Sequence, residues 1–192
     1  MSRLLRWTAL AAFTVASTGC ATMTVGSHLE RGLDFTVYRS FDWGPTDALP
    51  TGDPRLDKDP FFKDHLEGAV EKQLALKGFE RAAPGSADLL IHYHASINNR
   101  IDVNKMDSRY GYCYGEDCNA TVVEYEAGTL VIDVVDARTK KVIWRGWAQD
   151  SVEDVLGNQT RMARQIDEAV IRMLESFPRG SGQVAPRPVS QE

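Results

Sequence analysis

The chain has 192 residues, of which 43% are hydrophobic and 26% are charged, and its formal net charge at pH 7 is −5. This composition is typical of a soluble globular protein, and the length allows one ordinary domain with short appendages. The acidic excess grows to seven when the two arginines of residues 1–19 are removed, which argues against nucleic acid and anionic bilayer surfaces as partners.

The first nineteen residues have the layout of a secretory signal. Two arginines precede an apolar run at 7–15, and this run is shorter than the roughly 20 residues that a membrane-spanning helix needs. The small residues at 17–19, directly before Cys20, resemble a bacterial lipobox, although Ser17 stands where Leu is usual. By this resemblance Cys20 becomes the acylated mature N-terminus. The alternatives are an ordinary secretory peptide that is cleaved nearby and a different role for Cys20.

An acylated Cys20 would place the protein on a membrane. Two or more acyl chains suffice for stable anchoring, at about 0.8 kcal/mol per buried methylene. Ala21 follows Cys20, and by resemblance to sorted lipoproteins this favours the periplasmic face of the outer membrane. We therefore expect a lipoprotein signal peptide at 1–19, a lipid-anchored periplasmic domain at 20–178 and a disordered tail at 179–192.

The first part of the domain predicts two short strands, a loop and a helix. The strands are expected at 22–27 and within the aromatic-rich block 34–43. Residues 48–59 are rich in proline, glycine and charge, which predicts a surface loop. Asp59 then caps a proline-initiated helix that ends at Gly78. The apolar residues that recur at helical spacing are Phe62, Leu66, Ala69, Val70 and Leu74.

Residues 87–103 predict a long strand with two different faces. The core face carries Leu89, Ile91, Tyr93, Ala95 and Ile97. The opposite face carries His92 and His94, which project together because they are two residues apart. Such a pair can ligate a metal, but a third ligand is needed and none stands at a telling spacing. The pair is therefore either a metal-binding or catalytic element, or a solvated and hydrogen-bonded one.

Residues 106–118 contain three tyrosines that alternate with glycine and cysteine. In an oxidising periplasm Cys113 and Cys118 predict a disulfide that closes a short loop, with a stabilisation on the order of 2 kcal/mol. A metal site, which would need two further ligands, and free thiols are the alternatives. Exposed tyrosines offer contact area at little entropic cost, so the candidate binding residues are Arg109, Tyr110, Tyr112 and Tyr114. A hairpin tip without a partner is the alternative use.

The strongest hairpin signal of the chain lies in residues 128–148. A strand at 121–126 is expected to enter it through a turn at Ala127-Gly128. If Val135 pairs with Lys141, the hairpin has one wholly apolar face, and this pattern sets the register. That face consists of Leu130, Ile132, Val134, Val142, Trp144, Gly146 and Ala148.

The hairpin turn and a second helix complete the domain. Lys140 stands where a left-handed turn residue is needed, at a cost of roughly 1 kcal/mol. After a loop at 150–157, Asn158 is expected to cap the last helix, which Pro178 ends. The apolar stripe of this helix is Met162, Ile166, Ala169, Val170, Met173 and Phe177.

Runs of antiparallel strands with two amphipathic helices predict an α+β fold. We expect a two-layer sandwich in which a mainly antiparallel sheet carries both helices on one face. The other face is partly solvated, and it holds His92, His94 and the half-polar side of the hairpin.

Several motifs resemble the bacterial lipoproteins grouped as domain of unknown function 4136, over roughly residues 22–178. These motifs are the block Phe35–Trp43, Gly78-Phe79, Ala87-Asp88-Leu89-Leu90 with Tyr93-His94, Gly128-Thr129-Leu130-Val131-Ile132-Asp133, Trp144-Arg145-Gly146 and the C-terminal helix. The resemblance implies a periplasmic, lipid-anchored α+β domain with no assigned activity or ligand. Relatives often have a Gly/Tyr-rich loop where Cys113 and Cys118 stand, so the cysteine pair is a departure from the family.

Three functions remain open. A nucleophile elbow, an HExxH motif and paired carboxylates are all lacking from the sequence, so neither an enzyme nor a cofactor is expected. The first hypothesis is a protein- or ligand-binding accessory module of the cell envelope, with the membrane reached through Cys20 and an envelope protein as candidate partner. The alternative is a metal-binding or hydrolytic periplasmic enzyme that uses His92 and His94. The third is a structural lipoprotein without a specific ligand.

Overall fold

The computed structural model describes residues 23–45, 52–102 and 123–180. Their elements are β1 (Thr24–Leu29), the 3-10 helix η1 (Phe35–Val37), β2 (Ser40–Trp43), α1 (Pro54–Asp57), α2 (Pro60–Leu76), β3 (Glu80–Arg81), β4 (Leu89–Asp102), β5 (Val123–Asp136), β6 (Val142–Ser151) and α3 (Gln159–Glu175).

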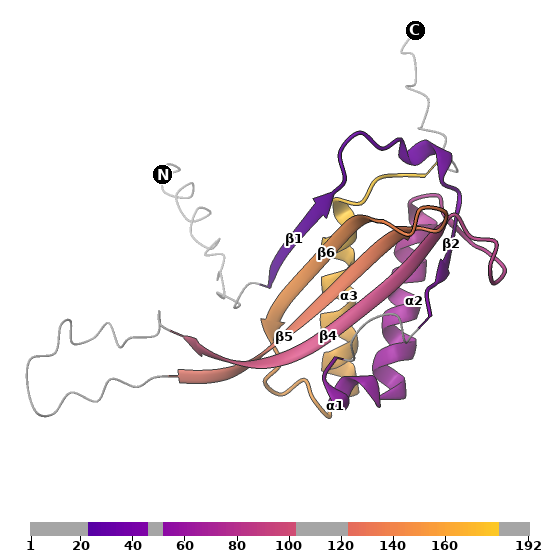
Figure 1. Ribbon diagram of the computed structural model, residues 1–192. Coiled ribbons are helices and arrows are strands. Elements are labelled where there is room, and N and C mark those ends of the chain that lie inside the picture. Colours follow the sequence, from indigo (N-terminus) through magenta and orange to yellow (C-terminus); the bar gives the residue numbers. More distant parts are fainter. Residues whose placement is uncertain (1–22, 46–51, 103–122, 181–192) are drawn as a thin grey trace, which may run out of the picture.

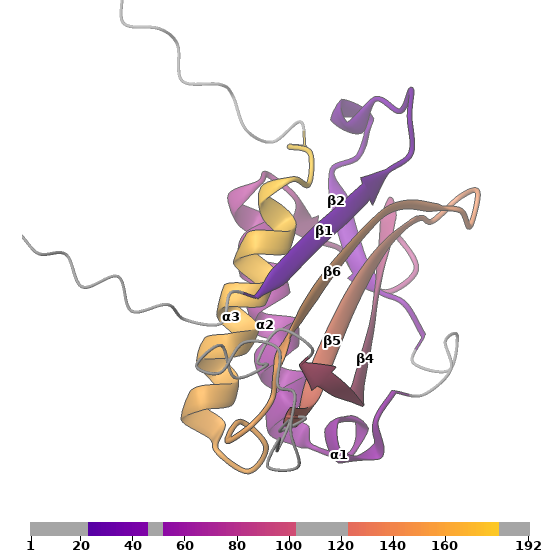
Figure 2. The same ribbon diagram turned by 90° about the vertical axis from the view of Figure 1, so that its left-hand side faces the viewer.

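The described strands form one six-stranded sheet in the order β1-β6-β5-β4-β2-β3. Pairing is antiparallel from β1 to β4, whereas β2 lies parallel to both β4 and β3. The two long helices α2 and α3 pack on one face of this sheet, as Figures 1 and 2 show from two sides. The predicted α+β fold with its helices on one face is confirmed. We call the face turned away from the helices the open face.

Both long helices begin as their sequences predict, and α2 also ends as predicted, whereas α3 ends at Glu175, before Phe177. The side chain of Asp59 accepts a hydrogen bond from the amide of Phe61 at the start of α2, and Asn158 accepts one from the amide of Arg161 at the start of α3. Gly78 follows α2 with a φ of 87°, a left-handed conformation that glycine adopts without strain. The residues of both predicted apolar stripes lie against the sheet, where they form the core with the apolar face of β4. One local prediction was incomplete, because α1 forms a short helix inside the segment expected to be only a loop.

The predicted turn at Ala127-Gly128 is wrong. Both residues lie inside β5, which runs without a break and pairs with β4 over its whole length, from Val123 opposite Asp102 to Asp136 opposite Leu89. Gly128 suggested a turn, but its conformation is that of a strand. It is small because Val152 occupies the adjoining space, where a Cβ on Gly128 would overlap the side chain.

The hairpin of β5 and β6 has the predicted core residues but a different register. Val134 pairs with Trp144 and Ile132 pairs with Gly146, so β6 is shifted by two residues relative to the register expected from Val135 opposite Lys141. An irregularity next to Val134 gives β6 an extra residue at this point, which has the effect of a β-bulge. Ile143 is 4% exposed and Val142 is 45% exposed, so the prediction that Val142 lies in the core is wrong.

The turn between β5 and β6 has the predicted left-handed residue. Lys140 has a φ of 58°, and its amide donates to the carbonyl of Asp136 at 2.8 Å. The Asp136 carboxylate accepts hydrogen bonds from the amides of Arg138 and Thr139, at 2.9 and 2.6 Å. An aspartate that organises the turn in this way compensates for the strain at the lysine.

Replacement of Lys140 by glycine is expected to raise the free energy of unfolding by about 0.5–1 kcal/mol, because glycine adopts the left-handed conformation without a Cβ clash. The thermal unfolding midpoint measures this change. Lys141→Gly is the matched control, and its midpoint is expected to fall, because Lys141 adjoins the turn without a positive φ. An unchanged or lowered midpoint in Lys140→Gly would contradict the role assigned to this turn residue.

Five aromatic side chains pack together at one end of the domain, and we call them the aromatic cluster. They are Phe35, Tyr38, Phe79, Trp144 and Phe177. Each is buried; Phe35 and Tyr38 come from η1 and its C-terminal cap, and the other three come from separate parts of the chain, up to the segment after α3. The cluster therefore joins both long helices to the sheet at this end.

Candidate functional site

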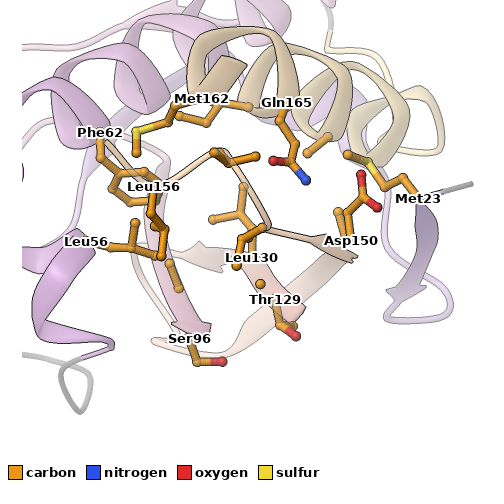
Figure 3. A pocket seen from close by; sticks show the side chains of 17 residues that line it. Met23, Leu56, Phe62, Ser96, Thr129, Leu130, Asp150, Leu156, Met162 and Gln165 are labelled. Carbon is orange, nitrogen blue, oxygen red and sulfur yellow. The ribbon is translucent and has the colours of Figure 1, made fainter. Parts of the chain in front are cut away.

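An apolar pocket lies at the opposite end of the domain, between the sheet and α3 (Figure 3). Its floor is formed by β4, β5 and β6, and α3 covers it. Leu56 of α1 and Phe62 of α2 close one side, and Met23 lies at the other side. The main apolar side chains are Met23, Leu56, Phe62, Leu130, Met162 and Ile166.

Small residues create this pocket. Ala95, Gly128 and Ala148 lie at core positions on three adjacent strands, and Ala169 lies opposite them on α3. Four short side chains leave a space that the surrounding leucine, methionine and phenylalanine side chains do not fill. Ala95, Ala148 and Ala169 stand at predicted core positions, whereas Gly128 was expected in a turn, so the only sequence signal for the pocket was the small size of these residues.

The pocket has a volume of about 80 Å³. An engineered apolar cavity of about 150 Å³ holds a benzene molecule, so this pocket takes a smaller group, such as the end of an alkyl chain. Its lining offers few polar atoms, and a polar ligand group inside it would lose its hydrogen bonds to water.

Two polar side chains lie at the rim of the pocket. In Figure 3 the amide of Gln165 and the carboxylate of Asp150 approach it from α3 and β6. Gln165 Nε2 donates to the carbonyl of Ser151 at 2.8 Å. An adjoining polar hollow shares Asp150 and Gln165 and is lined by both acidic and basic residues, among them Arg164 and Glu153. The site thus has an apolar interior and a polar entrance.

The open face of the sheet carries a second group of organised residues, which we call the Trp147 array. Strand pairing places twelve residues in three rows across β1, β6, β5 and β4. The middle row is Gly26, Trp147, Val131 and His94; the polar row beside it is Thr24, Gln149, Thr129 and Ser96; the charged row on the other side is His28, Arg145, Asp133 and His92.

An ion pair fixes the centre of the charged row. The Arg145 guanidinium donates to both oxygens of Asp133, at 2.5 and 2.6 Å. Asp133 is only 5% exposed, and the bidentate pairing compensates for the burial of its charge. The neighbouring His92 packs over Gly44. Burial lowers the pKa of His92 below its ordinary value, and the charge of Asp133 opposes this shift only in part, so His92 is neutral at pH 7.

The structure places His92 and His94 on the open face, as their spacing predicts. Across the described ranges, no group of three or more His, Cys, Asp or Glu side chains is arranged to hold a metal ion. In the same ranges no helix combines the length and apolar character needed to cross a membrane. The remaining candidate residues lie outside the described residues: Cys20, Arg109, Tyr110, Tyr112, Cys113, Tyr114 and Cys118.

Comparisons with known proteins relate the chain to one family and to several solved structures. The model of a family described as "Domain of unknown function (DUF4136)" matches residues 25–179. The chain has no match among curated proteins. A DUF4136 family protein from Bacteroides thetaiotaomicron is 14% identical with a TM-score of 0.49, and the match covers 80% of this chain and 94% of that one.

Two other solved structures have comparably low sequence identity and TM-scores. A PDZ domain protein from Parabacteroides distasonis is 15% identical with a TM-score of 0.49, and the match covers 81% of this chain. The present chain spans only 36% of that protein's length. The PelC dodecamer from Paraburkholderia phytofirmans is 12% identical with a TM-score of 0.43, with 80% of this chain and 95% of that chain covered.

Proposed function

The chain belongs to the DUF4136 family, a domain of unknown function, and from this premise we propose that it is a binding module of the bacterial cell envelope, anchored at the periplasmic face of the outer membrane by acyl chains on Cys20. The ligand group we assign to the apolar pocket is the end of an uncharged alkyl or acyl chain. The position and lining of the pocket support this proposal.

The pocket lies at the end of the domain from which the chain leads to the proposed anchor. Met23 lines the pocket and is three residues from Cys20, a span of at most about 10 Å. In an anchored protein the pocket would therefore lie close to the membrane surface, where lipids with one accessible alkyl chain are available. This location favours an alkyl ligand over a water-soluble metabolite.

The chemistry of the pocket selects among amphiphiles. Each methylene group that enters contributes about 0.8 kcal/mol, so a chain end that fills the small interior gives modest affinity. At the rim, Asp150 accepts a hydrogen bond from a hydroxyl group but repels a carboxylate. A neutral headgroup with a hydroxyl, as in an alcohol or a monoacylglycerol, therefore fits better than a free fatty acid.

Titration with octan-1-ol is expected to shift the methyl signals of Leu130, Met162 and Ile166 in NMR spectra of the chain from residue 21 onward. Octanoate is expected to bind at least about fivefold more weakly, because its charge meets Asp150. Ala169→Leu adds a side chain inside the pocket and should weaken octan-1-ol binding by more than about tenfold, since it occupies the ligand's space.

Ala75→Leu is the matched control for this experiment. It adds the same group at an exposed position of α2 and is expected to bind octan-1-ol as the unchanged protein does. Thermal unfolding of both variants verifies that they are folded. The proposal is contradicted if octan-1-ol produces no saturable shifts, or if a folded Ala169→Leu variant binds it unchanged.

No observation on the described residues favours the metal-binding or hydrolytic alternative at His92 and His94, and we do not propose it. The disulfide of Cys113 and Cys118 and contacts through the tyrosines of 106–118 stay predictions from the sequence.

A further inference from the structure

Trp147 is the one large side chain at the centre of the Trp147 array on the open face. It is 38% exposed, although it is surrounded on the sheet by shorter side chains. Its six-membered ring occupies the space in which Gly26 would carry a Cβ, so the indole packs on the bare backbone of β1. A larger residue at position 26 would displace the ring. The position of the indole is thus set by a glycine on the neighbouring strand.

Hydrogen-bonding groups flank the indole on both sides. In the polar row, Gln149 Nε2 donates to Thr129 Oγ1 at 3.0 Å, which orients the amide so that its oxygen is available. In the charged row, Arg145 uses Nε and Nη2 for Asp133. Its side chain is 52% exposed, and the guanidinium has further N–H groups that can donate to a ligand. The array therefore combines an apolar ring with donors and acceptors at fixed positions.

The charge of the array distinguishes it from the rest of the surface. Arg145 and Asp133 neutralise each other, and the neutral His92 adds no charge, whereas the whole chain carries a net charge of −5. The array therefore has no net charge that would attract a strongly charged ligand. The polar row and the charged row would lose their hydrogen bonds to water if an apolar partner covered them. The complementary ligand is uncharged, has a flat apolar side and carries many hydroxyl groups along its edges.

We propose that the Trp147 array binds an uncharged glycan by stacking a pyranose ring on the indole. The C–H face of the sugar covers Trp147, while hydroxyl groups on opposite edges of the sugar reach Gln149 and Arg145. Asp133 is a positioning residue that holds the guanidinium in place. The sheet face extends on both sides of Trp147 through the rows of the array, which favours a chain of sugars over a monosaccharide. This site lies on the opposite face of the sheet from the apolar pocket and does not depend on it.

Binding is measured by isothermal titration of the full chain in a detergent without a sugar headgroup. The probes are the N-acetylglucosamine tetramer and cellotetraose. Saturable binding of at least one probe is expected, and Trp147→Ala should lower its affinity by roughly tenfold or more through loss of the stacking surface. Trp147→Phe keeps a smaller ring and should show an intermediate affinity.

Two variants serve as controls. Ile171→Ala removes an exposed apolar side chain from α3 and is expected to bind the probes unchanged. Ala169→Leu, which fills the pocket, should also leave sugar binding unchanged, so failure at one site does not imply failure at the other. Circular dichroism verifies that each variant is folded. The proposal is overturned if neither probe binds the unchanged protein at millimolar concentration, or if folded Trp147→Ala binds as tightly as the unchanged protein.

Discussion

A Phe177→Ala variant is expected to lose about 4 kcal/mol of its free energy of unfolding, because it removes a packed ring from the centre of the aromatic cluster. Phe177 is 2% exposed, and its ring centroid lies 5.6 Å from that of Phe35, 5.5 Å from that of Phe79 and 5.1 Å from that of Trp144. Three separate segments supply these partners, so movement of one segment cannot close the resulting cavity. Urea unfolding followed by tryptophan fluorescence measures the loss.

Phe61→Ala provides the matched control for this prediction. Phe61 is a half-buried phenylalanine of α2 whose ring stacks on His65 with centroids 5.5 Å apart. Its removal is expected to cost about 1 kcal/mol, since this side chain lies at the edge of the core and is only partly buried. Phe177→Leu, which keeps part of the buried volume, should fall between the two. A cost below about 2 kcal/mol for Phe177→Ala would show that the cluster can collapse around the missing ring.

A Tyr38→Phe variant is expected to lose about 2 kcal/mol at pH 7, because it leaves a buried carboxylate oxygen without its donor. Tyr38 Oη donates to Asp136 Oδ2 at 2.8 Å, and both residues are buried. Asp136 also accepts hydrogen bonds from two backbone amides of the β5–β6 turn, those of Arg138 and Thr139. The variant keeps the aromatic ring and its packing, so the loss reports on the hydrogen bond.

The loss in Tyr38→Phe is expected to depend on pH. Burial alone would raise the pKa of Asp136, but the Thr139 amide, the Tyr38 hydroxyl and the Arg138 amide together hold it below its ordinary value of 3.8. A lowered folded-state pKa stabilises the protein above the unfolded pKa, and this stabilisation is lost as the pH falls through the folded pKa. The difference between the two proteins should therefore be largest at neutral pH and shrink below pH 3.8.

Urea unfolding at neutral and acidic pH tests this dependence, and a difference that stays constant on acidification would contradict it. The alkaline range gives an independent check. Burial, followed by the bond to Asp136, raises the pKa of Tyr38 to about 12 from the ordinary value of 10.0. The neutral phenol therefore stabilises the fold below pH 10 and ceases to do so as the pH rises toward 12. Phenylalanine cannot ionise, so Tyr38→Phe lacks this alkaline loss.

Local sequence patterns predicted the helices and the faces of the strands. The caps Asp59 and Asn158 and the stripes behind them depend only on neighbouring residues, and the structure confirms them. The alternation in β4 likewise separated its core face from the face of His92 and His94. These predictions succeeded because side-chain period and capping chemistry act within a few residues.

Predictions that depend on contacts between distant segments did not succeed in the same way. Beyond Val134, β6 is shifted by two residues from the expected register, one at the turn and one at the irregularity. An even shift keeps the alternate residues from Trp144 to Ala148 facing inward, so the apolar pattern alone could not distinguish the two registers. Gly128 was predicted to lie in a turn because its close contact with Val152, 24 positions further along, cannot be inferred from neighbouring residues. The parallel pairing of β2 with β4 also depends on how the connection through α1 and α2 crosses the sheet.

Both candidate sites belong to this second class. The pocket arises only when Ala95, Gly128, Ala148 and Ala169 meet across three strands and a helix. The Trp147 array likewise needs the register of four strands to bring Gly26 under the indole. Neither arrangement has a motif of adjacent residues.

The aromatic cluster and the pocket lie at opposite ends of the domain. Because one end is closely packed and the other holds an unfilled space, we expect the two ends to differ in compressibility. Hydrostatic pressure favours states that eliminate internal voids, so its effect should begin at the end of the domain that holds the pocket, next to Met23. A ligand that fills the pocket would remove this void and make this end of the domain less compressible. If the pocket binds alkyl chains as proposed, the compressibility of the domain would then depend on the concentration of such chains around it.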